Sequence, residues 1–299
     1  MNKKTIRNSL LLVLTAFIWG AAFVAQSEAG DTIGSFSFNF SRMLIGGVVL
    51  WPVIAFLDKK DPSRKPATKE AKRLQLIGGV ACGVILYVAG NLQQVGIAMG
   101  CSAGKAGFLT ACYIILVPIA GLFFHKKCGW NIWIGVVLTL VGLYLLCMTE
   151  RLTFELCDIL VILCAFSYTA HILVVDHFSP LVDGVRMSQM QFFVAGLLSG
   201  ITMIFTDMPS VNAWAMQFSS LDAWIPILYA GVLSCGVAYT LQIVAQNGLN
   251  PTVASLLMSL ESVFAVLTAW VIQGSVLSIR ELIGCAFIFV AIVLAQVIE

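Results

Sequence analysis

The sequence predicts an all-α integral membrane protein with ten transmembrane helices, arranged as two inverted repeats of five helices each. Three observations support this prediction: an apolar composition, ten apolar runs of spanning length, and an internal repeat. Of the 299 residues, 60% are hydrophobic and only 11% are charged, and the mean hydropathy is +0.96. A soluble domain of this size needs more polar surface than such a chain can supply. We therefore expect the protein to lie in a lipid bilayer.

The apolar runs set the number of spans. The first follows Lys3, Lys4 and Arg7 as in a signal peptide, but no A-x-A cleavage site follows it, so we expect an uncleaved helix. Each run is close to the ~20 residues with which a helix crosses ~30 Å of hydrocarbon. Strands of a membrane barrel would be shorter and would alternate in polarity. The runs are Ser9–Gln26, Ile33–Leu57, Leu74–Met99, Ala103–Phe124, Trp130–Met148, Phe154–Val175, Val185–Phe205, Ala223–Val244, Thr252–Ile272 and Ile279–Val297.

The basic residues predict the orientation of these spans. If the N-terminus is cytoplasmic, 13 of the 17 basic residues fall on the cytoplasmic side, and Arg151 and Arg280 fall on the other. Cytoplasmic loops of membrane proteins carry an excess of Lys and Arg, so this distribution supports a cytoplasmic N-terminus. Ten spans then place the C-terminus in the cytoplasm too, in a multi-pass protein of the cytoplasmic membrane. The 13 are Lys3, Lys4, Arg7, Lys59, Lys60, Arg64, Lys65, Lys69, Lys72, Arg73, Lys126, Lys127 and Arg186.

The second half of the chain repeats the first at a constant offset of 149 residues, as in Val117 and Val266 (266 − 117 = 149) or Gln93 and Gln242 (242 − 93 = 149). We assign residues 1–149 and 150–299 as the two units. Five spans are an odd number, so the second unit must cross the membrane in the opposite direction. The loops agree, because Asp58–Arg73 is strongly basic whereas its copy Asp207–Asp222 contains no Lys or Arg. Inverted five-helix repeats place a binding site near the midplane, at their interface.

Small residues on the fifth and tenth spans predict close helix packing. Gly135 and Gly142 lie seven residues apart on one face of the fifth span, and their copies are Gly284 and Ala291. Small residues allow helix backbones to approach closely in a membrane.

Glu261 is the strongest candidate for a functional residue. It is the only acid that lies midway along an apolar run. A carboxylate at that depth is stable only if it takes up a proton, pairs with a cation or faces a wet cavity. Arg42 and Lys105 are the only full-time cations inside spans, and both belong to the first unit. We therefore expect Glu261 to face a central cavity with Arg42 or Lys105 as its nearest cation.

Further polar and aromatic residues occupy matched positions in the two units. Each also has a packing interpretation: Lys105 could extend to the headgroups, the glutamines could bridge helices, and His171 could be a satisfied interior group. Helical spacing places Lys105 and Cys112 on one side of the fourth span, and Cys235, Tyr239 and Gln242 on one side of the eighth. The expected substrate-binding residues are Trp19, Arg42, Gln93, Lys105, Tyr113, Tyr168, His171, Tyr239, Gln242 and Glu261.

Other classes of protein find less support. The nine cysteines form no C-x-x-C pair, and with three histidines they form no evident metal site, so no metal, cofactor or catalytic residue is predicted. The net charge of +2 indicates no nucleic-acid partner, and the absence of a P-loop argues against ATP-driven pumping. A lipid-modifying enzyme would need a nucleophile paired with a base inside the spans. A scaffold or receptor is disfavoured by the short loops. The expected partners are a small-molecule substrate and the bilayer. The sequence does not decide whether the protein also forms a homodimer.

Several motifs, in this order, resemble the ten-helix EamA-type exporters of the drug/metabolite transporter superfamily. They are Trp19-Gly20, Arg42, the segment from Ser102 to Phe108 with Val117-Pro118, the segment from Leu260 to Ala265, and Leu282-Ile283-Gly284. The resemblance covers nearly the whole chain, although Ser262 stands where the family usually has proline after the acid. It implies a cavity lined by spans 1–4 and 6–9, with spans 5 and 10 outside. It also implies export or exchange of amino acids, other metabolites or drugs by alternating access. A nucleotide-sugar or phosphorylated-metabolite exchanger is the alternative within the same fold.

Overall fold

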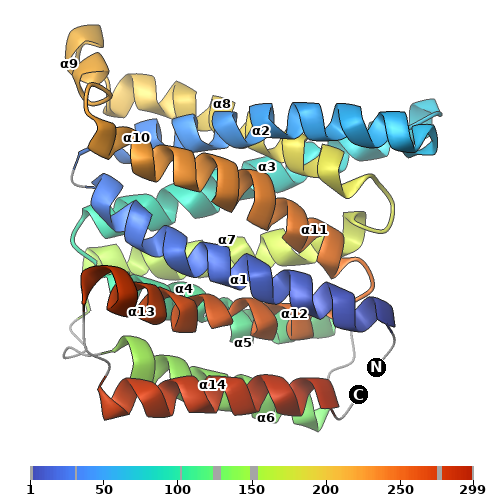
Figure 1. The fold of residues 1–299 in the computed structure, drawn as a ribbon, viewed down its shortest axis with the longest axis vertical. Coiled ribbons are helices and arrows are strands. Elements are labelled where there is room, and N and C mark those ends of the chain that lie inside the picture. The colour runs from blue at the N-terminus through green and yellow to red at the C-terminus, as the bar shows by residue number, and fades with distance from the viewer. Residues whose placement is uncertain are drawn as a thin grey trace.

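The computed structural model describes residues 3–30, 32–101, 103–123, 129–148, 154–274 and 278–297, and these residues form helices and connections without strands. Each predicted apolar run coincides with a helix or a series of helices (Figure 1). The first half contains α1 (Lys3–Gly30), α2 (Ser35–Lys60), the short η1 (Pro62–Arg64), α3 (Lys69–Ala98), α4 (Ala103–Ala111), α5 (Tyr113–Phe123) and α6 (Trp130–Cys147).

The second half follows the same order. It contains α7 (Leu156–Phe178), α8 (Gly184–Thr206), the short α9 (Val211–Met216), α10 (Leu221–Leu228), η2 (Tyr229–Tyr239), α11 (Thr240–Gln246), α12 (Pro251–Met258), α13 (Leu260–Gln273) and α14 (Ile279–Val297). Among the described residues, nine helices or helix series have the length and composition of membrane spans, and α14 forms a further helix at the position of the tenth span. The predicted fold class is therefore confirmed.

The ten helices form one bundle in which each half packs against the other. The helices α2 and α8 lie along each other, α3 packs against α7 and α8, and α1 packs against α13 and η2. The first residue of α1 and the last residue of α14 lie at the same end of the bundle, as an even number of crossings requires (Figure 1). The end where α1 begins also carries η1 and the basic connection between α2 and α3.

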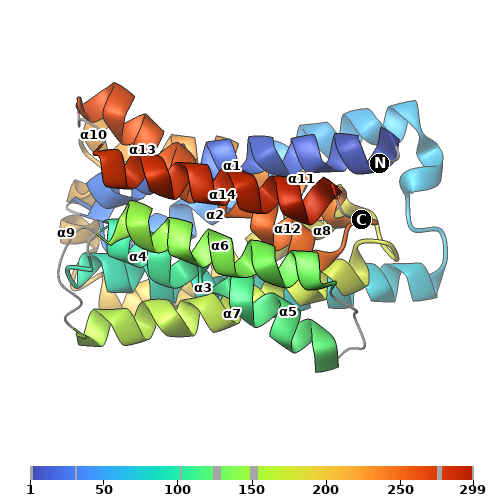
Figure 2. The same cartoon turned by 90° about the horizontal axis from the view of Figure 1, so that it is seen from below.

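The helices α6 and α14 form a separate outer layer, as predicted for the fifth and tenth spans (Figures 1 and 2). Gly142 and Gly284 meet at their crossing. A Cβ atom at Gly142 would lie 2.7 Å from the Gly284 carbonyl oxygen, and one at Gly284 would lie 2.6 Å from the Gly142 carbonyl oxygen. Only glycine permits this approach, so the predicted packing role of these residues is confirmed.

Three spans are not continuous α-helices. The fourth is divided at Cys112 into α4 and α5, and the ninth is divided at Ser259 into α12 and α13. The eighth passes through the π-helix η2, whose wider turns shift the register of the residues that follow. These three irregular spans carry much of the candidate site.

Some predicted features lie outside the described residues. These are Ser102 of the fourth-span motif and the basic residues Lys126, Lys127 and Arg151.

A polar pocket between the two halves as candidate functional site

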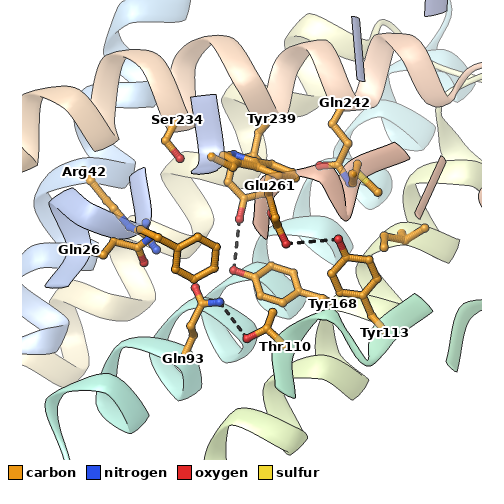
Figure 3. Close-up of a pocket in the computed structure, with 14 residues that line it drawn as sticks. Gln26, Arg42, Gln93, Thr110, Tyr113, Tyr168, Ser234, Tyr239, Gln242 and Glu261 are labelled. Carbon is orange, nitrogen blue, oxygen red and sulfur yellow. Dashed lines mark hydrogen bonds between the residues drawn. The ribbon is translucent and has the colours of Figure 1, made fainter. Parts of the chain in front are cut away.

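A small pocket lies between the two halves of the bundle (Figure 3). Helices from both halves supply its walls. Its cavity volume is about 40 Å³, which leaves room for a few water molecules, whereas sites for drug-sized ligands measure roughly 300–1,000 Å³. The pocket as it stands is therefore too small for a drug-sized ligand. The lining residues are Trp19, Phe23, Gln26, Arg42, Gln93, Thr110, Tyr113, Tyr168, Ile172, Ser234, Tyr239, Gln242, Met258 and Glu261.

Glu261 enters the pocket from the first turn of α13, immediately after the division of the ninth span. Its side chain is buried, and Oε1 accepts a hydrogen bond from the Tyr113 hydroxyl at 3.3 Å. The N-terminal turn of a helix is a favourable position for a carboxylate, because the helix dipole is positive there. Among the described residues, no basic side chain lies within 4 Å of this carboxyl group. Glu261 thus lines the same pocket as Arg42, one of the two cations expected near it, but forms no ion pair with Arg42 or Lys105 within the described residues.

Arg42 is the basic residue of the pocket. It lies on α2 and is 2% exposed. Its Nε donates to Asn39 Oδ1 at 2.7 Å, and its guanidinium lies 5.2 Å from the centre of the Phe38 ring. Its Nη2 has no hydrogen-bond partner within the described part of the chain. A buried cation with an unsatisfied donor is costly unless an anion reaches it, so this nitrogen is a natural contact for an anionic group of a ligand.

Aromatic side chains make up much of the remaining wall. The rings of Trp19 and Tyr239 meet edge to face, with 4.7 Å between their centres, and the hydroxyls of Tyr168 and Tyr239 lie 3.3 Å apart. Trp19 reaches this position because Gly20 brings α1 against α13. A Cβ atom at Gly20 would lie 2.6 Å from the Glu261 carbonyl oxygen.

Two equivalent amides also line the pocket. Gln93 donates to Thr110 Oγ1 at 3.1 Å, and Gln242 Oε1 has no partner among the described residues. Thr110 escaped the sequence analysis because Lys105 and Cys112 define a different face of the fourth span. Thr110 lies three residues before Tyr113, so the two share a face of the span and both line the pocket.

The eighth span shows a change of register. Uniform α-helical spacing predicted Cys235 beside Tyr239 and Gln242. Because η2 has the wider turn of a π-helix, Ser234 lines the pocket with them. Cys235 instead packs against α2, where its Sγ lies 3.8 Å from Met43 Sδ. Cys235 thus lies in the same core cluster as Tyr239, but it does not line the pocket.

Two of the predicted binding residues lie elsewhere. Lys105 pairs with Asp158 at 2.6 Å, at the end of the bundle opposite η1. His171 is buried behind the pocket wall, and its Nε2 lies 3.0 Å from Gln191 Oε1. The structure brings the other predicted residues together in one pocket (Figure 3).

Contacts between the halves close both ends of the α2–α8 pair. At the end with η1, Arg186 pairs with Asp58 at 2.5 Å and Arg64 pairs with Asp183 at 2.6 Å. At the opposite end, Asp207 Oδ2 accepts hydrogen bonds from Ser37 N at 2.8 Å and Ser37 Oγ at 3.1 Å. Asp58 and Asp207 are equivalent at the repeat offset (207 − 58 = 149), and so are Ser37 and Arg186 (186 − 37 = 149). Equivalent positions thus form the contact between α2 and α8 at each end, Asp58–Arg186 at one and Ser37–Asp207 at the other.

A helical membrane bundle with divided spans and a polar pocket between its two halves has the architecture of secondary transporters. Comparison with known proteins agrees at the level of a transporter family. The model of the EamA-like transporter family matches residues 7–148 and again residues 155–296. The chain belongs to this family.

Relatives in several organisms carry transporter names. An uncharacterized transporter of Archaeoglobus fulgidus is 26% identical over 98% of this chain and 87% of its own length. An uncharacterized transporter of Bacillus subtilis is 23% identical over 95% of this chain and 89% of its own length. A protein of Chlamydia muridarum named S-adenosylmethionine/S-adenosylhomocysteine transporter is 30% identical, but over 44% of this chain and 41% of its own length. One crystal structure superposes with a TM-score of 0.78 at 16% identity, covering 98% of this chain and 97% of the other, which shows the shared fold.

Proposed function

We propose that this protein is a secondary transporter that exports or exchanges small zwitterionic metabolites, such as amino acids, across the cytoplasmic membrane by alternating access. One observation carries the proposal. Arg42 and Glu261, which bear opposite formal charges, line the same buried pocket, and neither has an ion-pair partner within the described residues. Buried ionisable groups inside a membrane bundle mark substrate pathways.

The arrangement of the pocket fits a ligand with both charges. Figure 3 shows Arg42 on one side of the pocket and the Glu261–Tyr113 pair on the other. The free Nη2 of Arg42 would bind a carboxylate, because a guanidinium donates charge-assisted hydrogen bonds to such groups. Glu261 and the faces of the aromatic side chains would hold an ammonium or another cation. The name of the Chlamydia muridarum relative is consistent with such a solute, since S-adenosylmethionine contains an amino-acid group.

The position of Lys105 argues against phosphorylated substrates. A nucleotide-sugar or phosphorylated-metabolite exchanger needs several bases in its cavity, and the sequence offered only Arg42 and Lys105 for this role. Lys105 is held by Asp158 and does not line the pocket. The family and the names of the relatives likewise favour transport over an enzymatic role.

Counterflow in proteoliposomes tests the proposal. Purified protein is reconstituted with pooled unlabelled amino acids inside, and the entry of labelled amino acids is measured with and without a pH gradient. We expect exchange by the wild type and at least about a tenfold loss in Arg42→Gln, because the lost contact to a ligand carboxylate contributes roughly 1.5–3 kcal/mol. Glu261→Gln should abolish or reduce exchange. An amide cannot ionise, so any pH dependence that arises from Glu261 should disappear in this variant.

The matched control is Thr139→Ala. Thr139 is also a buried polar residue inside a span, but it lies on α6 and does not line the pocket. Its variant should exchange like the wild type. Normal exchange by Glu261→Gln at every pH would reduce Glu261 to a packing residue. If the wild type exchanges only phosphorylated metabolites, the proposed substrate class is wrong.

A further inference from the structure

Two cysteines and an aspartate meet at the end of the bundle opposite η1. Cys101 follows α3 in the first half of the chain, whereas Cys157 and Asp158 lie in the first turn of α7 in the second half. Their ligand atoms all lie within 4.8 Å of one another. All three side chains are buried, with exposures of 4% for Cys101, 3% for Cys157 and 1% for Asp158. Residue spacing does not reveal this cluster, because Cys101 and Cys157 are far apart along the chain.

The distances in the cluster suit a metal ion. Asp158 Oδ1 lies 3.7 Å from Cys101 Sγ and 3.8 Å from Cys157 Sγ. A tetrahedral zinc ion with bonds of about 2.3 Å to sulfur and about 2.0–2.2 Å to oxygen separates a sulfur and an oxygen ligand by about 3.5–3.7 Å. The two sulfur–oxygen separations are therefore within about 0.1 Å of those of a zinc site, and small side-chain rotations would complete it.

The surroundings hold the aspartate in the required orientation. Asp158 Oδ2 accepts a hydrogen bond from Lys105 Nζ at 2.6 Å and another from the Glu155 backbone N–H at 2.7 Å. Both contacts leave Oδ1 directed at the thiols. Partners of this kind fix the ligands of metal sites and tune their affinity.

The charges also balance. Without metal, two neutral thiols accompany one carboxylate and one ammonium. With a divalent ion, two thiolates and the carboxylate carry three negative charges, which the ion and Lys105 neutralise, and the two thiol protons are released. The three ligands and Lys105 together are neutral in both states. The Glu155 carboxylate also lies 3.9 Å from Cys157 Sγ, but Glu155 is exposed, so water screens its charge.

We propose that Cys101, Cys157 and Asp158 form a binding site for a thiophilic divalent cation, with Zn²⁺ as the ion that fits best. Thiolate and carboxylate ligands suit Zn²⁺, and three protein ligands leave its fourth position for water. The site lies apart from the central pocket and links the two halves of the chain. Its existence does not depend on the proposed transport function.

Metal binding by the full-length reduced protein in detergent tests the site. Zn²⁺ is titrated by calorimetry, and Cd²⁺ by the ultraviolet charge-transfer absorption of its thiolate complexes. We expect one ion per chain in the wild type, and affinities at least about tenfold lower in Cys101→Ser and Cys157→Ser. Cys82→Ala is the matched control, because Cys82 is equally buried but lies on α3 away from the cluster. It should bind like the wild type.

A second measurement uses only the wild-type chain, in case the serine variants do not fold. Zn²⁺ should protect Cys101 and Cys157 from alkylation and leave the half-buried Cys112 unprotected, as peptide-level mass spectrometry would show. Equal affinity for Zn²⁺ in the wild type and in either folded serine variant would overturn the proposal. So would alkylation of Cys101 and Cys157 at the same rate with and without Zn²⁺.

Discussion

The ion pair between Arg186 and Asp58 offers a direct test of how the pocket is closed. It joins the N-terminal turn of α8 to the C-terminal turn of α2, at the end of the bundle that carries η1. If this end must open to admit a substrate, the pair must break in the open state. Arg186→Gln removes the guanidinium charge and should therefore raise the population that is open at this end.

The size of the effect follows from the geometry. The contact is 2.5 Å long, and the two side chains are 22% and 15% exposed. Hydrogen bonds to charged groups contribute roughly 1.5–3 kcal/mol when buried, and exposed ion pairs roughly 0.2–1 kcal/mol. A partly exposed pair should lie between these limits, at about 1–2 kcal/mol. At about 1.4 kcal/mol per factor of ten, the open population should rise about 5- to 30-fold.

Alkylation of a cysteine placed in the pocket measures this population. Met258→Cys puts a thiol at a buried lining position, and a membrane-impermeant maleimide is added from each face in turn. Because the thiol reacts only when the pocket opens, its rate reports the open fraction. The matched control is Lys65→Gln. Lys65 also faces Asp58, but at 3.9 Å and with 62% of its side chain exposed, so its loss should change the rate less, by about 1.4- to 5-fold.

Two outcomes would refute this reasoning. Equal rates in Arg186→Gln and Lys65→Gln would show that the short ion pair does not hold this end closed. Labelling that becomes faster only from the face opposite η1 would show that the Arg186–Asp58 pair does not control opening at the end with η1.

Three further predictions concern the fold. Gly142→Val should lower the stability by roughly 1–3 kcal/mol through overpacking against Gly284, whereas Val141→Ile, on the exposed side of α6, should leave the melting temperature unchanged; equal melting temperatures would contradict the assigned contact. Reporter fusions should place both termini and Lys65 in the cytoplasm and Asn212 outside, and a C-terminus outside the cytoplasm would refute the predicted orientation. Superposing residues 9–148 on 158–297 should require a two-fold rotation about an axis in the membrane plane, whereas an axis along the membrane normal would contradict the inverted repeat and our boundary between residues 149 and 150.

Much of the candidate site could be predicted from the sequence, because polar groups are rare inside a membrane span. Glu261 and Arg42 stand out for this reason, and the repeat offset identifies Gln93 and Gln242 together. The sequence did not reveal where the helices depart from regular α-helix. The π-helix η2 brings Ser234 into the pocket beside Tyr239, and the fourth and ninth spans are each divided. Local propensity does not encode these changes of register, because packing against neighbouring helices decides them.

The sequence by itself determined the number and limits of the spans, because the thickness of the bilayer fixes how many consecutive apolar residues a helix needs. It also determined the packing of the outer helix pair, through the small residues on α6 and α14. Only the tertiary structure decided the partner of Lys105. From the sequence, Lys105 near its helix end could contact headgroups, a pocket ligand or an acidic side chain. In the structure, the start of α7 brings Asp158, 53 residues away in the chain, into contact with Lys105. The same approach of α7 to the end of α3 joins Cys101 to Cys157, since long-range packing, not local spacing, sets which chain segments meet.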